Sequence, residues 1–302
     1  MHSKTINVKK RKRLDKYLVS LLKISRTKAS QLIRLKQIYV NKVMINKPSF
    51  QLKQNDEIEI INSDKSKQID VNLKPCKKKL DIVYEDQYLL VINKPKNVLV
   101  HPTKFNEKNT IANRLINYLG NFSNDKIRPG IVHRLDKNTT GLLVIAKDLK
   151  TLAALKKQID EKTMLRKYIC LCHNHFTTKK IIINRPIDHD RKKKTIKMVV
   201  SSAKKAKKAI TKITVLKNLK NNLSLVECTL YTGRTHQIRV HLKSINHCVY
   251  NDDLYGKIED KKKYGQFLHA YKLSFIHPWT KKTMNFIIKP DPIFYEKIKN
   301  LE

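Results

Sequence analysis

The stretch GIVHRLDKNTTGLLVIAK, residues 130–147, places one carboxylate, Asp136, in a short polar segment between two apolar runs. Short apolar runs bounded by polar residues are typical of buried strands, so we expect a loop flanked by two core strands. A carboxylate on such a loop is held in position by the scaffold rather than merely solvated. Asp136 is therefore the first candidate for a functional residue.

A buried carboxylate is costly unless a cation is dedicated to it. The chain offers one in YTGRTHQIRVHL, residues 231–242, where alternation predicts a strand with Gln237, Arg239 and His241 on one face. Arg239 is then the candidate partner of Asp136, and the pair would favour the ionised carboxylate that a nucleophile or base requires. A structural ion pair without a catalytic role is the alternative.

The charge balance favours a polyanionic partner. The 302 residues include 65 Lys and Arg against 25 Asp and Glu, a formal net charge of +40. Such a surface neutralises phosphates and supplies sequence-independent affinity for nucleic acid. The abundance of Lys, Asn and Ile also fits an AT-rich genome, so part of the charge reflects composition. In such a chain a retained arginine or glycine indicates a position with special demands, and we take Arg134 and Arg234 as candidate RNA contacts.

The N-terminal region predicts a small α+β domain. Residues 13–24 carry leucines at helical spacing, and Ser25 fits the N-cap of a second helix over 26–34. Short β-prone pieces follow and end with IEIIN at 58–62. This order resembles the S4 RNA-binding domain over residues 11–62, with a small helical cap as the alternative. The candidate phosphate contacts are Lys16, Arg26 and Arg34.

A second, larger domain is expected after a basic linker. Residues 63–79 are polar, rich in lysine and without apolar periodicity, which predicts the linker. From residue 80 to 302, short β-rich runs alternate with turns and a few helical stretches, such as 149–160. The pattern predicts an α+β domain built on a mixed, mostly antiparallel sheet. The basic segment 188–208 is expected to form exposed loops or strand edges.

Other features limit the classes of function. The five cysteines form no CxxC pair, and CLCHNH at 170–175 fits a strand better than a zinc site, so we expect no metal and a reducing cytosol. KKRKR at 9–13 is interpreted as a solvated basic lead-in, with a nuclear signal as the alternative. We see no secretory signal and no apolar run long enough to span a bilayer, so the expected location is the cytoplasm, without membrane contact.

Several longer motifs resemble one family in the same order. HRLDKNTTGLLVIAK at 133–147 closely resembles the signature of the RluA/RluD family of pseudouridine synthases. INKPKNVLVHP at 92–102, TMLRKYIC at 163–170 and FLHAYKLSFIHP at 267–278 resemble further motifs of that family, as does the arginine-bearing stretch described above. The resemblance covers about residues 80–290, and the S4-like head fits the common architecture.

The resemblance implies a mechanism. Uridine is detached at its glycosidic bond, the base turns, and C5 is rejoined to the ribose, an isomerisation that needs no cofactor and no metal. Asp136 matches the catalytic aspartate, as nucleophile or as base, and Arg239 matches the arginine that pairs with it. Tyr168 matches the active-site tyrosine, which stacks on the base and assists proton removal from C5. The uridine must be flipped out of its helix, and Arg134 is placed to fill the vacated stack.

Two departures from the family pattern predict backbone conformations. The family usually has glycine where this chain has Asn97 and Asn251, and asparagine is the residue that best tolerates the left-handed region, so we predict positive φ at both. Thr140 replaces the commoner serine.

The motif wording is most similar to the branch that modifies large-subunit (23S) ribosomal RNA, so the expected partner is that RNA or a pre-ribosomal particle, bound by a monomer. A non-catalytic RNA-binding or ribosome-assembly factor on the same scaffold is the alternative. A glycosidase or nuclease would need paired carboxylates or a metal cluster, and the sequence shows neither beside Asp136. The uridine or uridines modified stay open.

Overall fold

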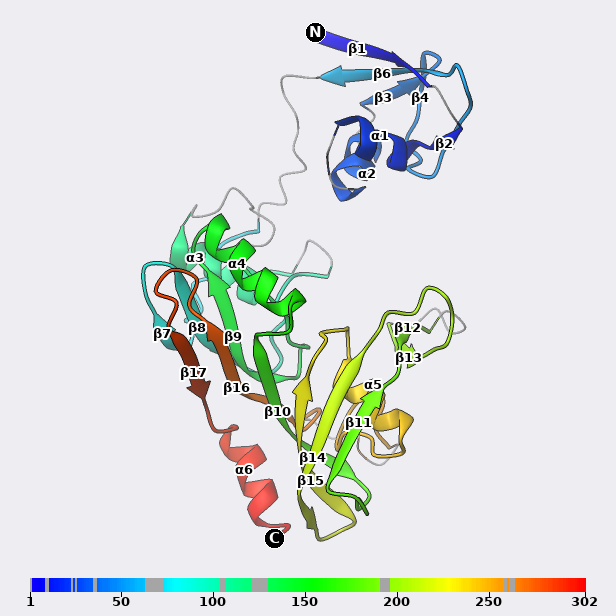
Figure 1. Cartoon of the computed structure of the whole chain (residues 1–302). Helices are drawn as coiled ribbons and strands as arrows, with labels where there is room; N and C mark the ends of the chain where they lie inside the picture. The colour runs from blue at the N-terminus through cyan, green and yellow to red at the C-terminus, as the bar shows by residue number, and fades with distance from the viewer. Residues whose placement is uncertain are drawn as a thin grey trace. The chain divides into compact units, whose positions relative to one another are not determined.

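The computed structural model divides the chain into two compact units, Met1–Asp70 and Val71–Glu302 (Figure 1). It describes residues 2–8, 11–22, 24, 26–34, 37–62, 73–103, 107–120, 130–190, 196–257, 260 and 264–302.

The first unit packs two helices against a four-stranded sheet of order β1-β6-β3-β4. Helix α1 (Leu14–Leu22) and helix α2 (Arg26–Arg34) lie where the leucine spacing predicts them. Their apolar faces form one core with the sheet, in which Leu18, Ile33 and Ile58 are buried. The sheet strands are β1 (His2–Asn7), β3 (Ile38–Val40), β4 (Val43–Met44) and β6 (Glu57–Asn62), and β2 (Lys12–Arg13) pairs with β5 (Gln51–Leu52).

Strand β1 was not predicted, because the expected domain begins at residue 11 and β1 precedes it. Its residues pair antiparallel with β6, and Ile6 lies opposite Ile58. Long-range pairing, rather than any local signal, makes this segment a strand. Ser25, the predicted N-cap of the second helix, lies outside the described residues.

The second unit is built on a nine-stranded sheet of order β11-β14-β15-β10-β16-β9-β8-β7, with β17 added on β16. Every pairing is antiparallel except that of β16 with β9. The predicted fold class, α+β with a mixed, mostly antiparallel sheet, is confirmed. The strands are β7 (Ile82–Glu85), β8 (Leu89–Lys94), β9 (Thr140–Ala146), β10 (Leu165–His173), β11 (Lys180–Asn184), β14 (Ile210–Leu219), β15 (Leu223–Leu230), β16 (Leu268–Ile276) and β17 (Thr283–Ile287).

The parallel contact between β16 and β9 joins the two halves of this sheet. It consists of the pairs His269–Thr140 and Ala270–Gly141. A Cβ atom on Gly141, whose φ is 114°, would lie 2.3 Å from the carbonyl oxygen of Ala270. Only glycine therefore allows the two strands to approach this closely.

Helices and a small hairpin complete the second unit. Helix α4 (Leu149–Asp160) covers the predicted residues and packs Leu152 and Leu155 on the face of β9 (Figure 1). Asp148 caps it by accepting a hydrogen bond from the backbone N–H of Thr151. The remaining elements are α3 (Ile111–Leu119), α5 (Gln237–Ser244), α6 (Pro292–Lys299) and the hairpin of β12 (Ile187–His189) with β13 (Met198–Val200).

The described part of the predicted linker, residues 73–79, runs along α3. Leu73 is buried in the core of the second unit. The backbone N–H of Cys76 donates to the carbonyl of Asn113, and the Asn113 amide donates to the carbonyl of Lys74. These bonds fix the segment to the second unit. Residues 63–72 lie outside the described part of the chain.

Two local predictions near the site were wrong. Residues 130–132 are buried but form only an isolated bridge, between Ile131 and Ile145, rather than a strand. The predicted strand through Gln237, Arg239 and His241 is helix α5. Its sequence also fits helical spacing, because Ile238 and Leu242 enter one core together, and packing selects the helix.

Two other local predictions are confirmed, one on backbone conformation and one on residues 170–173. Asn97 and Asn251 both have φ of 60°, as predicted from the replaced glycines. The cysteine-rich stretch 170–173 belongs to strand β10. Across the described ranges, we find no helix with the length and apolar character needed to cross a membrane.

Candidate active site

A cavity of about 400 Å³ opens in the second unit. Its wall is formed by the loop before β9, by the end of α4, by strand β10, by residues 230–239 and by Leu268 of β16. Asp136, Tyr168 and Arg239, three residues that are far apart in the sequence, all line it, as do Arg134 and Arg234. A pocket of this size suits a ligand of nucleotide dimensions.

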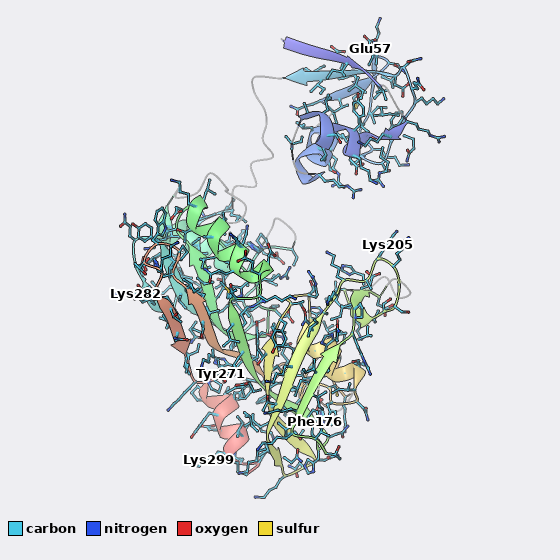
Figure 2. The ribbon with its side chains drawn as sticks, in the orientation of Figure 1. Glu57, Phe176, Lys205, Tyr271, Lys282 and Lys299 are labelled. Carbon is cyan, nitrogen blue, oxygen red and sulfur yellow. The ribbon has the colours of Figure 1, made fainter. Side chains whose placement is uncertain are left out.

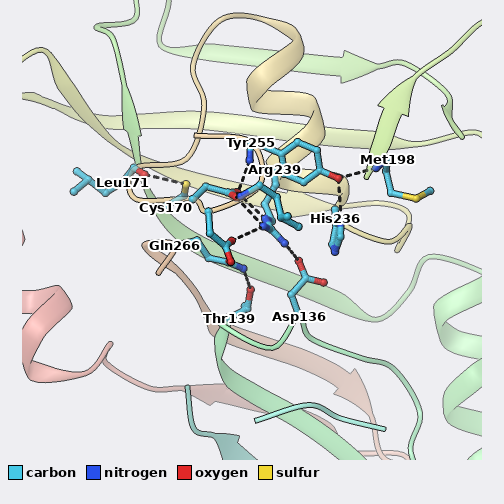
Figure 3. A network of polar contacts seen from close by, with 12 residues as sticks. Asp136, Thr139, Cys170, Leu171, Met198, His236, Arg239, Tyr255 and Gln266 are labelled. Atoms are coloured by element: carbon cyan, nitrogen blue, oxygen red, sulfur yellow. Dashed lines mark hydrogen bonds and ion pairs between the residues drawn. The ribbon is translucent and has the colours of Figure 1, made fainter. Parts of the chain in front are cut away.

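The loop that carries Asp136 is held at several points. The backbone N–H of Thr139 donates to the carbonyl of Asp136 at 3.1 Å and closes a turn. The side chain of Gln266 donates to the Thr139 hydroxyl at 2.9 Å (Figure 3). Buried Lys94 donates to the carbonyl of Lys137 at 3.1 Å. A carboxylate on this loop is therefore fixed in position by its neighbours.

Arg239 contacts Asp136 directly. Its Nη1 donates to Oδ2 of Asp136 at 3.0 Å (Figure 3). The Arg239 side chain is 4% exposed and that of Asp136 is 18% exposed, so the carboxylate faces the cavity while the guanidinium lies behind it. Burial alone would lower the pKa of Arg239, but the carboxylates of Asp252 and Asp136 raise it, and the guanidinium stays charged.

A second carboxylate, which sequence reasoning missed, orients this arginine. Asp252 accepts hydrogen bonds from Nε of Arg239 at 2.6 Å and from Nη2 at 2.7 Å. Oδ1 of Asp252 also accepts from the backbone N–H groups of Leu254 and Tyr255. The one sequence signal was the preceding Asn251, whose positive φ turns the chain here.

Tyr168 lies on β10 with its side chain in the cavity wall. It is 5% exposed. Burial raises its pKa to about 12, while Arg166 opposes this shift and Asp136 adds to it. The side chain is thus a neutral phenol at physiological pH. Its ring provides a flat apolar surface close to Asp136.

The two predicted RNA-contacting arginines at the cavity differ in their surroundings. Arg134 is exposed at the cavity wall beside Asp136. Arg234 is also exposed, but its Nε donates to the carbonyl of Lys208 at 3.0 Å and its backbone N–H donates to the side chain of Gln237. Arg234 therefore helps to order the turn that leads into α5.

The helix places the residues of the wrongly predicted strand on different faces. Gln237 and His241, one turn apart, both contact the hydroxyl of Thr211 on β14. Arg239 projects the other way, toward Asp136. One face of the helix is thus anchored to the sheet, and the opposite face presents Arg239 to the cavity.

A tyrosine links this site to the hairpin of β12 and β13. The Tyr255 hydroxyl accepts from the backbone N–H of Met198 at 2.7 Å and lies 2.9 Å from Nδ1 of His236 (Figure 3). Burial lowers the pKa of His236, which favours its neutral ring. Lys205 lies at the tip of the segment beyond β13 (Figure 2).

The predicted phosphate contacts of the first unit lie on its helices. Lys16 is exposed on α1, and Arg34 is exposed at the end of α2. Arg26 is exposed, but its Nε donates to Asp15 at 2.9 Å. Burial would raise the pKa of Asp15, and its hydrogen bonds to Arg13 and Arg26 lower it instead. Among the described residues, no cluster of three His, Cys, Asp or Glu side chains could hold a metal ion.

Comparison with known proteins places the chain in a family. Residues 88–244 match the family model described as RNA pseudouridylate synthase, and residues 12–58 match the S4 domain. The fold is similar to that of human RNA pseudouridylate synthase domain containing 1, with a TM-score of 0.59 and 24% identity over 72% of this chain and 85% of that one.

Two curated relatives extend the likeness over most of the chain. An uncharacterized RNA pseudouridine synthase of Mycoplasma genitalium is 42% identical over 292 residues, covering 96% of this chain and 92% of that protein. Ribosomal large subunit pseudouridine synthase D of Borreliella burgdorferi is 38% identical over 240 residues, covering 77% of this chain and 71% of that protein. The chain belongs to the RNA pseudouridine synthase family of isomerases and carries an N-terminal S4 domain.

Proposed function

We propose that the protein converts uridine to pseudouridine in large-subunit ribosomal RNA and that Asp136 is its catalytic carboxylate. The observation that carries the proposal is the Asp136–Arg239 ion pair in the cavity wall, at 3.0 Å. The choice of RNA is supported by the name of the Borreliella burgdorferi relative and by that of Zymomonas mobilis, also a ribosomal large subunit pseudouridine synthase D, 35% identical over 287 residues.

The reaction rearranges one nucleotide without adding or removing atoms. The bond from N1 of uracil to C1′ of the ribose breaks, the base turns, and a bond from C5 to C1′ forms. The proton of C5 leaves and N1 gains one. Asp136 acts either by covalent attack or by taking a ribose proton, and both roles use the carboxylate that Arg239 holds in the cavity wall.

Tyr168 supports the detached base in this proposal. Its buried ring offers a face on which uracil can stack, and stacking on an aromatic side chain is worth about 1–3 kcal/mol per base. With a pKa raised by burial to about 12, the phenol stays protonated at neutral pH, so its ring, rather than a phenolate, is the group it offers.

Access to the cavity requires a flipped nucleotide. Removing a uridine from a stack costs a few kcal/mol, and exposed Arg134 at the cavity wall would fill the space left behind. Arg234, Lys16, Arg26 and Arg34 would contact the RNA backbone. The net charge of +40 supports binding. We expect a monomer that acts in the cytoplasm.

The test is a conversion assay on in-vitro transcribed large-subunit ribosomal RNA and on transfer RNA, with pseudouridine mapped by chemical adduct and primer extension. Asp136→Asn keeps the shape of the side chain and removes its charge, and Lys150→Asn, at an exposed position of α4, is the matched control. Site-specific conversion by the wild type and the control, lost in Asp136→Asn while RNA binding persists, is the expected result. If the wild type binds both RNAs but converts neither, the alternative function, a non-catalytic ribosome-assembly factor, would be supported instead.

A further inference from the structure

One buried cation in the cavity wall has a guanidinium nitrogen without a hydrogen-bond partner in the part of the chain that the structure describes. Arg166 on β10 is 6% exposed, and its Nε has no hydrogen-bond acceptor among the described residues. The other two buried arginines of the described chain donate from all three guanidinium nitrogens. Arg114 donates to Asn109 and to the carbonyl of Lys79, and Arg239 is bound by carboxylates. Arg166 is therefore the exception.

The guanidinium of Arg166 lies at the cavity, on the same face of β10 as Tyr168. Both side chains line the cavity, and both are buried, while Lys167 between them points to the other face and pairs with Glu227. Two residues of a strand span about 7 Å. This is comparable to the distance from the base to the phosphate within one nucleotide.

Gly233 leaves room for this guanidinium. A Cβ atom at position 233 would lie 2.8 Å from Nη1 of Arg166. The glycine therefore allows the turn before α5 to close over the arginine. The charge also acts on its neighbours, because burial and Arg166 together lower the pKa of His133 to about 3.

A buried charge without a counter-ion is destabilising, so such a group in a pocket indicates a missing anion. Asp160 lines the same cavity but is exposed and forms no ion pair with Arg166. The planar fork of a guanidinium matches the oxygens of a phosphate. RNA, the substrate class of the family, supplies phosphates at every nucleotide.

We infer that Arg166 binds the phosphate on the 5′ side of the nucleotide whose base lies against Tyr168. The arginine then serves as a binding residue that sets the depth and direction of the flipped nucleotide. This inference rests on the proposed function for the identity of the nucleotide. The arginine is charged before RNA arrives and gains its counter-ion only in the complex.

A mononucleotide tests the subsite without any turnover. We would measure the melting temperature of the full chain with uridine 5′-monophosphate and with uridine at equal ionic strength. The wild type should be stabilised more by the phosphorylated ligand. Arg166→Met, which keeps the length of the side chain, should lose this difference, and Arg166→Lys should retain part of it. Equal effects of both ligands on the wild type would overturn the inference.

The free protein gives a second readout. Arg166→Met should raise the melting temperature without ligand, because it removes an uncompensated buried charge. A structural role for Arg166 predicts the opposite, and a lower melting temperature together with unchanged phosphate discrimination would contradict our assignment. Gly233→Ala should displace the guanidinium and weaken phosphate discrimination while leaving the charge in place.

The RNA complex allows a cycle of substitutions. A synthetic hairpin carrying the mapped uridine would have an uncharged methylphosphonate on its 5′ or its 3′ side. The 5′ substitution and Arg166→Met should each weaken binding about tenfold, and their combination should be no worse than either alone. Arg166→Met should also flatten the dependence of log K on log salt by about 0.7. Additive losses would overturn the inference.

The two proposals fail separately. A wild type that converts ribosomal RNA, combined with additive losses in the cycle, would keep the proposed function and remove the role of Arg166. A wild type that converts no RNA, but distinguishes uridine 5′-monophosphate from uridine through Arg166, would keep the phosphate subsite and remove the proposed function.

Discussion

Arg239 lies closer to Asp252 than to Asp136. Its bonds to Asp252 measure 2.6 and 2.7 Å, and its single bond to Asp136 measures 3.0 Å. The Asp252 side chain is fully buried, whereas that of Asp136 is 18% exposed. Asp252 therefore fixes the guanidinium plane, and the remaining N–H is presented to the carboxylate that faces the cavity.

This arrangement predicts that Asp252→Asn damages both stability and activity. Removing one charge of a buried pair leaves the other poorly compensated, so unfolding free energy should fall by about 3 kcal/mol. The turnover number should fall as well, because Arg239 loses its orientation. Urea unfolding and the conversion assay measure the two effects.

The adjacent Asp253 is the matched control. It is 58% exposed and 3.4 Å from Arg239, so Asp253→Asn should change stability by less than about 0.5 kcal/mol. Equal losses in the two variants would show that Asp252 has no special role.

Lys94 should make stability depend on pH. Burial lowers its pKa from 10.5 to about 7, with Asp136 partly opposing the shift. Between these two values the unfolded chain binds more protons than the folded one, so the stability should rise with pH across this window. Urea unfolding at several pH values should show a smaller rise in Lys94→Met than in the wild type.

Burial also lowers the pKa of Lys96 to about 7, so Lys96→Met should flatten the same window. Lys94 alone bonds the carbonyl of Lys137, next to Asp136. We therefore expect a lower turnover number only in Lys94→Met. An identical pH dependence of stability in Lys94→Met and the wild type would contradict the first expectation.

Tyr168 should act through its ring and not through a phenolate. With its pKa at about 12, the phenolate fraction grows tenfold per pH unit between pH 7 and 9, so a phenolate base would give a rate that rises in the same way. We expect the rates of the wild type and of Tyr168→Phe to depend on pH in the same way, without a rise that needs the phenolate. Tyr168→Leu, which lacks the ring, should weaken RNA binding about tenfold or more. Steady-state kinetics of the three proteins across this pH range decide the point.

The two left-handed asparagines should respond differently to glycine. Asn97 is exposed, so Asn97→Gly should change stability by less than about 0.5 kcal/mol, whereas Asn97→Val should cost about 1–2 kcal/mol. Asn251 is buried and donates to the carbonyl of Gly265, so Asn251→Gly should cost about 1–3 kcal/mol. Thermal unfolding of the variants measures each change, and equal effects of glycine at both positions would be inconsistent with this account.

Local signals were sufficient for much of the fold. The leucine spacing of α1 and the apolar periodicity of α4 indicated these helices, since each has one face that must be buried. The cavity loop was also found, because Asp136 is a carboxylate in an apolar setting. Positive φ at Asn97 could be predicted because glycine was expected there.

Long-range packing decided the rest. Residues 237–242 satisfy both alternation and helical spacing, and only the cores on either side of α5 select the helix. Asp252 and Arg166 form no recognisable pattern in the sequence. Asp252 matters because folding brings it to Arg239, and Arg166 matters because folding buries its Nε without an acceptor among the described residues. Strand β1 forms because its residues pair with those of β6.

The order of the strands in the large sheet has a consequence for synthesis of the chain. Strand β16 lies between β10 and β9, although it is made long after both. Asp136 belongs to the β9 side and Tyr168 to β10, so the sheet joins these two sides only after residues 268–276 have left the ribosome. A chain that ends before β16 would therefore carry every catalytic candidate without the strand that joins their two sides of the sheet.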